Sequence, residues 1–146
     1  MNPENVHQIK KATLKESDCY QVPAINELKA DLEKLPPAQI EIVHLFAPGT
    51  YARVAKIPAG TAFVSKIHKT NHFHALVSGT IRLTNCYDEV KEYTGPVSGM
   101  TKIGTQRAAY AVTDCAFMTV HKTNKTNLRE IEGEVIAKDR SELCLG

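Results

Sequence analysis

Three histidines, His68, His72 and His74, stand within one short segment of a chain that has six histidines in all. Side chains alternate between the two faces of a strand, so His72 and His74 are expected to point the same way if residues 71–77 are extended. His68 precedes the polar segment 69–71, and a bend there would bring a third imidazole to the pair. Neutral imidazoles bind zinc, iron, nickel or manganese, so the spacing predicts a divalent transition-metal site. The alternative is that the three rings pack without a metal.

The elements that would position these side chains are mainly β. From Ile40 onward, short runs rich in β-branched and aromatic residues are separated by turn residues such as Gly79. These runs predict an antiparallel sandwich or barrel. The predicted strands are 40–46, 51–57, 61–67, 72–77, 80–85, 107–113 and 116–121.

A helix is expected on either side of this β region. Ile25, Leu28, Leu32 and Leu35 recur at helical spacing before two prolines, which predicts an amphipathic N-terminal helix that packs on the outside of the barrel. Asn127, with Glu130 three residues later, is a capping pattern that predicts a short C-terminal helix. The expected organisation is an N-terminal arm and helix (1–39), a barrel (40–122) and a C-terminal segment (123–146).

Composition argues against several classes of protein. The chain has 146 residues, enough for one domain, and its formal net charge of +2 is spread along the sequence, so nucleic-acid binding is not indicated. Neither a signal peptide nor a long apolar membrane span is recognisable. The 4 cysteines lie far apart, which favours reduced thiols over a disulfide framework.

Two motifs resemble those of a known superfamily. Pro58-Ala59-Gly60, the pair His68 and His72, and Ser78-Gly79 follow one another with a predicted strand before, between and after them. This order resembles the first motif of the cupins, which are small jelly-roll barrels. The segment 104–107, Gly-Thr-Gln-Arg, resembles their second motif. Over residues 28–136 the chain is similar to uncharacterised cupin-like proteins carried by tailed bacteriophages. The resemblance implies a cupin-like jelly roll, located in the cytoplasm of the infected host cell or associated with the virion.

The chain departs from the cupin pattern at the metal ligands. By that resemblance His68 takes the place of a ligand histidine and His72 that of the glutamate, whereas Lys66 and Arg107 occupy the places of the other two histidines. Cationic side chains cannot coordinate a divalent ion and repel it. A different metal set remains open, in which His44 or His121 joins from another strand. The candidate metal ligands are His68, His72, His74, His121 and His44.

The cations favour a second interpretation, a pocket for a small anion. A guanidinium binds carboxylate or phosphate through two parallel hydrogen bonds. The candidate ligand-binding residues are Arg107, Lys66, Tyr110 and Arg53. One expectation opposes this grouping: if Asp114 and Cys115 form a two-residue turn, Ala108 pairs with His121, and Arg107 faces away from His121.

Three functions are therefore compatible with the sequence. The favoured one is a phage accessory protein that binds a metal ion or small ligand in its barrel, without turnover. The others are a virion-associated or assembly protein with a structural barrel, and a metal-dependent enzyme of the cupin kind (oxygenase, isomerase or lyase). Lys66 and Arg107 replace two metal ligands, which counts against the enzyme because a catalytic metal needs its ligand set. A homo-oligomer is expected, since open strand edges such as 40–46 favour pairing.

Overall fold

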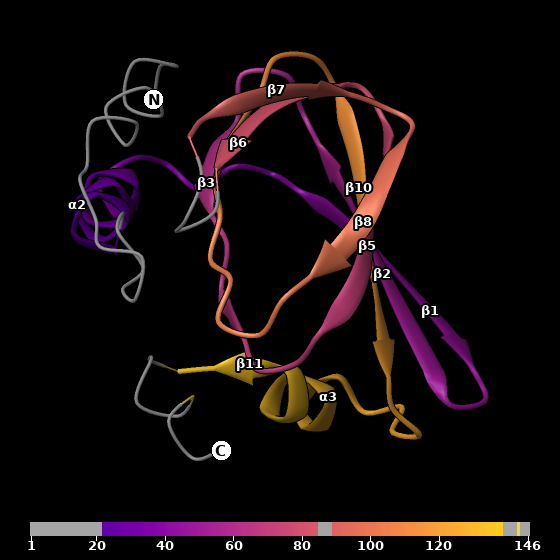
Figure 1. The fold of residues 1–146 in the computed structure, drawn as a ribbon. Coiled ribbons are helices and arrows are strands. Elements are labelled where there is room, and N and C mark those ends of the chain that lie inside the picture. The colour runs from indigo at the N-terminus through magenta and orange to yellow at the C-terminus, as the bar shows by residue number, and fades with distance from the viewer. Residues whose placement is uncertain (1–21, 85–88, 139–142, 144–146) are drawn as a thin grey trace.

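The computed structural model describes residues 22–84, 89–138 and 143, and shows two sheets that face one another, one helix outside them and one helix at an open end (Figure 1). The predicted mainly-β fold with a helix on either side is confirmed. The predicted arm over residues 1–21 lies outside the described residues. The elements are α2 (Val22–Glu33), β1 (Glu41–Ala47), β2 (Thr50–Ile57), β3 (Ala62–Val64), β4 (Ile67–His68), β5 (His72–Ser78), β6 (Thr80–Thr84), β7 (Lys91–Thr94), β8 (Val97–Thr101), β9 (Ala108–Ala111), β10 (Cys115–Lys122), α3 (Leu128–Val135) and β11 (Ile136–Ala137).

The strands form two main antiparallel sheets. The larger sheet has the order β1-β2-β10-β5-β8, the smaller sheet has the order β3-β9-β6-β7, and β11 pairs with β4 in a separate ribbon. Strand β1 is an edge strand, as the sequence predicted for residues 40–46. Strands β7 and β8 were not among the predicted strands, because their short sequences, KEYT and VSGMT, lack the β-branched and aromatic density of the others.

The predicted pairing of residues 107–113 with 116–121 is wrong. Strand β9 pairs with β3 and β6 in the smaller sheet, whereas β10 pairs with β2 and β5 in the larger one. Residues 112–114 therefore cross from one sheet to the other instead of making a hairpin turn. Since β9 and β10 do not pair, the register that placed Arg107 and His121 on opposite faces does not exist.

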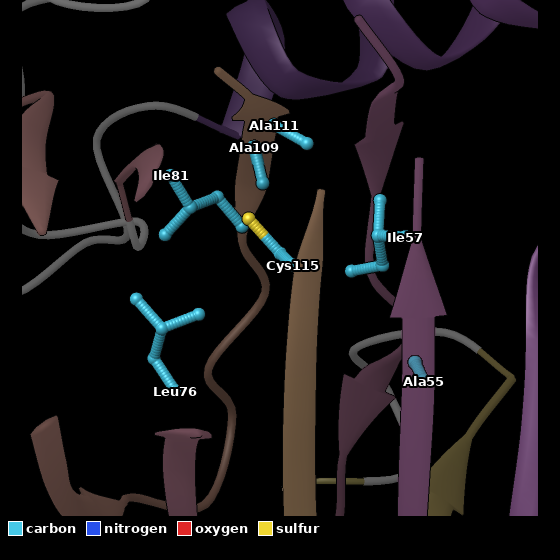
Figure 2. Packing of buried hydrophobic residues seen from close by; sticks show 7 residues of the cluster. All are labelled: Ala55, Ile57, Leu76, Ile81, Ala109, Ala111 and Cys115. Atoms are coloured by element: carbon cyan, nitrogen blue, oxygen red, sulfur yellow. The ribbon is translucent and has the colours of Figure 1, made fainter. Parts of the chain in front are cut away.

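The two sheets enclose one apolar core. Its buried side chains come from both sheets, and Figure 2 shows them converging in the space between the strands. Four of them, Ala55, Ile57, Ile81 and Ala109, also line a cavity that extends from the core toward α3. The core therefore forms the floor of that cavity. The seven buried members of the core are Ala55, Ile57, Leu76, Ile81, Ala109, Ala111 and Cys115.

Helix α2 covers the outside of the smaller sheet. Ile25 and Leu28 are 0% and 5% exposed and pack with Ala108, and Leu32 lies partly buried beside them. This confirms the predicted apolar face at three positions. Leu35, the fourth predicted contact, is 42% exposed and lies after the end of the helix.

Shortening one α2 side chain is expected to cost a small, measurable amount of stability. Ile25→Val removes one methylene from a fully buried site, and such changes lower the free energy of unfolding by about 1 kcal/mol. Denaturant unfolding of the full chain measures the change. The control Leu35→Ala alters an exposed residue, and a change of less than about 0.5 kcal/mol is expected. Equal effects of the two substitutions would contradict the packing described here.

Helix α3 lies across the open end of the barrel (Figure 1). It begins at the predicted cap: the Asn127 side chain accepts hydrogen bonds from the backbone N–H groups of Arg129 and Glu130. Polar contacts fix the helix to neighbouring segments. Lys66 pairs with Glu132, Thr123 donates to Glu134 at 2.7 Å, and the Lys69 backbone N–H donates to the Val135 carbonyl at 2.7 Å. Across the described residues, neither helix has the length and apolar character to cross a membrane.

Candidate functional site

The space between the sheets contains a cavity of about 500 Å³ that is bounded at one end by α3. Its walls are mostly apolar, and they combine the core residues of both sheets with Leu128, Ile131 and Val135 of the helix. Pockets of this volume with mainly apolar walls and polar groups that can orient a ligand are typical small-molecule sites. The polar side chains that line it are His44, Tyr51, Arg53, Ser65, Lys66, His68, Arg107, Thr119, His121 and Glu132.

Three histidines meet near this end of the barrel, at the ends of three different strands. The ring centroid of His72 lies 4.5 Å from that of His68 and 4.4 Å from that of His121. We call these three residues the histidine trio. They are 9%, 5% and 4% exposed for His68, His72 and His121, so all three rings are buried. The sequence predicted that His68 and His72 would meet, and left His121 as a candidate from another strand.

Backbone carbonyls fix the protonation of two members of the trio. Nδ1 of His68 lies 3.3 Å from the Thr105 carbonyl oxygen, and Nδ1 of His72 lies 3.0 Å from that of Thr70. A carbonyl only accepts, so each Nδ1 carries the proton and each neutral ring keeps its lone pair on Nε2. His72 Nε2 and His121 Nδ1 are buried and have no hydrogen-bond partner in the described part of the chain. The trio therefore offers unused hydrogen-bonding capacity.

Burial keeps the trio neutral. Desolvation, and then the proximity of His72, lowers the pKa of His68 from 6.5 to about 3. The same two causes lower the pKa of His121 to about 4. Desolvation is also the main cause that lowers the pKa of His72, and the Arg107 guanidinium adds to it. At neutral pH the trio is uncharged, so it adds no positive charge to that of nearby Arg107.

His74 lies on the same face of β5 as His72, as predicted, but it joins a different group. Nδ1 of His74 lies 2.8 Å from the Thr101 hydroxyl, which also accepts a 2.8 Å hydrogen bond from Arg107 Nη2. Since the hydroxyl accepts from the guanidinium, its own proton is directed to His74. The guanidinium also stands 6.0 Å from the centre of the Phe117 ring. His74 and Thr101 therefore orient Arg107 instead of joining the trio.

The backbone around Arg107 is fixed by the neighbouring strand segment. Its N–H donates to the Ser65 hydroxyl and its carbonyl accepts from the Ser65 N–H, both at 2.8 Å. Three residues earlier in the chain, the Gly104 N–H donates to the His68 carbonyl at 2.8 Å. The two cupin-like motifs of the sequence thus lie side by side, which places Arg107 at the cavity wall near His68. The Arg107 guanidinium has no carboxylate partner among the described residues, and burial lowers its pKa.

The other predicted ligand-binding residues lie in different settings. Lys66 lines the cavity but forms its ion pair with Glu132 of α3, and both side chains are exposed. Arg53 lines the cavity from β2. Tyr110 follows Ala109 on β9 and faces the opposite side of the sheet, so it is not among the described residues of the lining.

Tyr51 is a site residue that the sequence analysis did not include. Its hydroxyl lies 2.7 Å from Nδ1 of His44, and its ring centroid lies 6.1 Å from that of His121. His44, the fifth predicted metal ligand, is therefore connected to the trio through a tyrosine. The alternation of side chains along β2 could have identified Tyr51 in the sequence, because Tyr51 and Arg53 are two residues apart and share the inner face.

The resemblance to cupins implies a bound metal ion, which needs a suitable set of side chains. The carbonyl contacts of His68 and His72 resemble those that orient histidine ligands. However, no group of three or more His, Cys, Asp and Glu side chains among the described residues is placed to hold one ion. Cationic Lys66 and Arg107 occupy two of the four places that the family resemblance gives to ligands. The residues therefore do not fit a cupin metal centre.

Comparison with known proteins concerns the fold alone. No protein-family model and no curated protein matches the sequence significantly. Among solved structures, ectoine synthase from P. lautus is 12% identical, with a TM-score of 0.55 over 68% of this chain and 75% of that one. An RmlC-like cupin with a double-stranded β-helix fold from Methanocaldococcus jannaschii is 11% identical, with a TM-score of 0.49 over 60% and 84%. A cupin superfamily protein from Desulfitobacterium hafniense is 10% identical, with a TM-score of 0.49 over 64% and 85%. At 12% identity the likeness to ectoine synthase concerns the fold and not the function.

Proposed function

We propose that the protein binds a small organic anion with an apolar body inside its barrel. The observation that carries this proposal is Arg107, a largely buried cation at the cavity wall without a carboxylate partner in the described chain. A buried charge is costly unless it is paired, and an anionic ligand would supply the missing partner. Thr101 accepts from Nη2 and His74 Nδ1 lies 3.5 Å from the same nitrogen, which leaves the Nη1 and Nε donors of the planar fork for a carboxylate or phosphate.

The charge of the lining supports an anion over a cation. Arg53, Lys66 and Arg107 line the cavity together with one carboxylate, Glu132, which is paired with Lys66. The histidines of the lining are neutral because their pKa values are lowered, so the lining owes its positive charge to these cations. A small anion therefore meets a positive potential at this end of the barrel.

The apolar part of the ligand is inferred from the floor of the cavity. Ile57, Ile81 and Ala109 are nearly inaccessible to solvent, and Phe63 and Leu83 pack against them. An anion that carries an aromatic or branched aliphatic group would bury that group here, at about 25 cal/mol per Å². Of the trio, His68 and His121 line the cavity, and their neutral rings would accept hydrogen bonds from hydroxyl or amine groups of the same ligand.

Paired probes test the proposal by isothermal titration calorimetry. Phenylacetate and phenyl phosphate carry an anionic group on an apolar body, and phenylacetamide is the matched neutral compound. We expect the anions to bind and the amide to bind at least tenfold more weakly. Arg107→Gln is expected to weaken anion binding by about 10- to 100-fold, because a charge-assisted hydrogen bond contributes roughly 1.5–3 kcal/mol.

Arg82→Gln is the matched control. Arg82 pairs with Glu92 at 2.9 Å, and alternation on β6 directs it away from the cavity that Ile81 and Leu83 line. The control removes the same charge and should leave anion affinity unchanged. Equal affinities for the amide and the anions would overturn the proposal. An equal loss of anion affinity in Arg107→Gln and Arg82→Gln would also overturn it. Elemental analysis of untagged protein completes the test, and close to one equivalent of a transition metal would favour a metal site instead.

The narrower biological roles rest on sequence resemblance alone. A phage accessory protein acting in the host cytoplasm is the role that this resemblance favours. A virion-associated structural barrel is the alternative if no anion binds, and a cupin-type enzyme is the alternative if a bound anion is converted. Mass spectrometry of small molecules released from protein expressed in the natural host distinguishes the three, since it shows an unchanged ligand, none, or a product.

A further inference from the structure

The charges that line the cavity do not balance. Arg53, Lys66 and Arg107 contribute three cations to the described lining, and Glu132 contributes one carboxylate. The lowered pKa values of the buried histidines of the lining keep their rings neutral. The lining therefore has an excess of two positive charges. A ligand group with two negative charges would match this excess, whereas a carboxylate would match half of it.

Lys66 and Arg107 lie on neighbouring segments of the cavity wall. Lys66 follows Ser65, and the Ser65 N–H donates to the Arg107 carbonyl at 2.8 Å. The Arg107 N–H donates in turn to the Ser65 hydroxyl at 2.8 Å. These two hydrogen bonds hold the backbones of the cationic residues together, and both cationic side chains line the cavity. One doubly charged group can therefore contact both cations at once.

The floor of the cavity does not favour a second, separate anionic group. Ile57, Ile81 and Ala109 form this floor, are nearly inaccessible to solvent and offer no side-chain hydrogen bond. A charged group buried among them would be costly. Both negative charges are therefore expected on one terminal group. A phosphate monoester has this property, because it carries a charge of about −1.5 to −2 at neutral pH and three acceptor oxygens.

The Glu132 carboxylate already provides Lys66 with an anionic partner. It reaches Lys66 from α3 and accepts a hydrogen bond from the ammonium group. The two side chains are 66% and 51% exposed for Lys66 and Glu132, and exposed ion pairs contribute little to stability. A phosphate held by Arg107 can therefore take the place of Glu132 at Lys66 with little loss to the fold.

Glu132 has a second cation within electrostatic reach. The hydrogen bond from Lys66 is the main cause that lowers the pKa of Glu132, and the Arg53 guanidinium adds to it. Arg53 is exposed and forms no ion pair among the described residues. Helix α3 can stay in place during the exchange, because the Val135 carbonyl accepts from the Lys69 N–H at 2.7 Å. Only the Glu132 side chain has to turn from one cation to the other.

We propose that the ligand is a phosphate monoester whose dianionic group contacts Arg107 and Lys66 together, and that Glu132 is an internal competitor which this phosphate displaces from Lys66. The inference rests on the proposed anion pocket and narrows its ligand to one class. In the complex, Glu132 pairs with Arg53, so each of the three cations has an anionic partner. The apolar body of the ester lies on the floor of the cavity.

Two phosphate esters of similar shape test the charge of the ligand by isothermal titration calorimetry. Phenyl phosphate is a dianion at about pH 8, because its second pKa is about 6. Methyl phenyl phosphate is a diester and carries one negative charge. We expect phenyl phosphate to bind about tenfold more tightly than the diester, since it alone has charge for both cations. Lys66→Gln should remove most of this difference and leave the affinity for the diester nearly unchanged.

The competition by Glu132 is tested with a double-mutant cycle. Glu132→Gln is expected to raise the affinity for phenyl phosphate by about two- to fivefold, a modest gain because the ion pair that it removes is exposed. In the Lys66→Gln background the gain should be absent, because Glu132 competes through Lys66. Glu130→Gln is the matched control: it removes the same charge from α3, but Glu130 is exposed and not among the described lining residues. Its affinity should equal that of the parent protein.

The outcomes separate this inference from the anion pocket on which it rests. Equal affinities of the parent protein for the two esters would overturn the inference, and so would an equal gain in Glu130→Gln and Glu132→Gln. If both esters still lost affinity in Arg107→Gln, the anion pocket itself would stand. Binding of neither ester nor phenylacetate would overturn the pocket and the inference together. Lys66, Glu130 and Glu132 are exposed, so each variant should keep a cooperative melting transition.

Discussion

Gly79→Ala is expected to lower the free energy of unfolding by about 3 kcal/mol or more. Gly79 joins β5 to β6 at a φ of +91°, where a side chain is strained. A Cβ at this position would also overlap the Asp114 carbonyl oxygen and lie 2.8 Å from the Cα of Cys115. Both contacts are with backbone, which cannot rotate away as a side chain can. Residues 79 and 114 belong to the turns where the chain changes sheets, so the overlap would separate the two sheets at the core.

Denaturant unfolding measures this loss, and a second glycine provides the control. Gly133 lies within α3, and a Cβ there would meet nothing within 4 Å. Gly133→Ala is expected to stabilise the protein by about 0.5–1 kcal/mol, because alanine loses less conformational entropy in a helix. Opposite signs for the two substitutions support the close approach at Gly79. A loss below about 1 kcal/mol in Gly79→Ala would contradict it.

The second large effect is a loss of stability on mild acidification. The folded pKa values of His68 and His121 are lowered to about 3 and about 4, whereas an unfolded histidine has a pKa of about 6.5. Below pH 6.5 the unfolded chain therefore takes up protons that the folded chain does not. The stability is fully present above pH 6.5, and it falls as the pH drops toward the folded pKa values.

The expected slope is large for a chain of this size. Each additional proton bound by the unfolded state changes the free energy of unfolding by about 1.4 kcal/mol per pH unit. The two buried histidines alone give about 3 kcal/mol per pH unit near pH 5.5, against a total stability of about 5–15 kcal/mol for a typical domain. Unfolding free energies measured from pH 7 to pH 5 should show this slope. In His121→Gln the slope should decrease by the contribution of about one proton, about 1.4 kcal/mol per pH unit. An unfolding free energy of the parent protein that does not change with pH would contradict the buried neutral trio.

Local patterns along the sequence determined most of the elements. The spacing of Ile25, Leu28 and Leu32 predicted α2 and its buried face, because a helix brings residues three and four apart onto one side. Asn127 predicted the start of α3, because its side chain satisfies N–H groups only two and three residues away. The alternation of side chains along a strand predicted that His72 and His74 lie on one face of β5. Each of these predictions depends on interactions within a few residues.

Contacts between distant segments were not determined in this way. The sequence grouped His68, His72 and His74 by proximity, whereas the structure joins His68 and His72 to His121 and joins His74 to Arg107. The turn at Asp114 resembled a hairpin, although β9 and β10 belong to different sheets. Local residues specify that a turn occurs there. Which sheet the next strand joins depends on what the whole core can bury.

The electrostatic character of the site was also decided by tertiary structure. Arg107 is recognisable in the sequence as a cation in place of a histidine. Its burial, its contact with Thr101 and the lack of a carboxylate partner among the described residues come from elements far apart in the chain. In the same way, the lowered pKa values of the trio result from desolvation, which exists only once the sheets and α3 enclose the rings. The sequence by itself determined which groups could do chemistry. Only the packing of two sheets decided which of them meet and in what charge state, because burial and distance are properties of the folded chain.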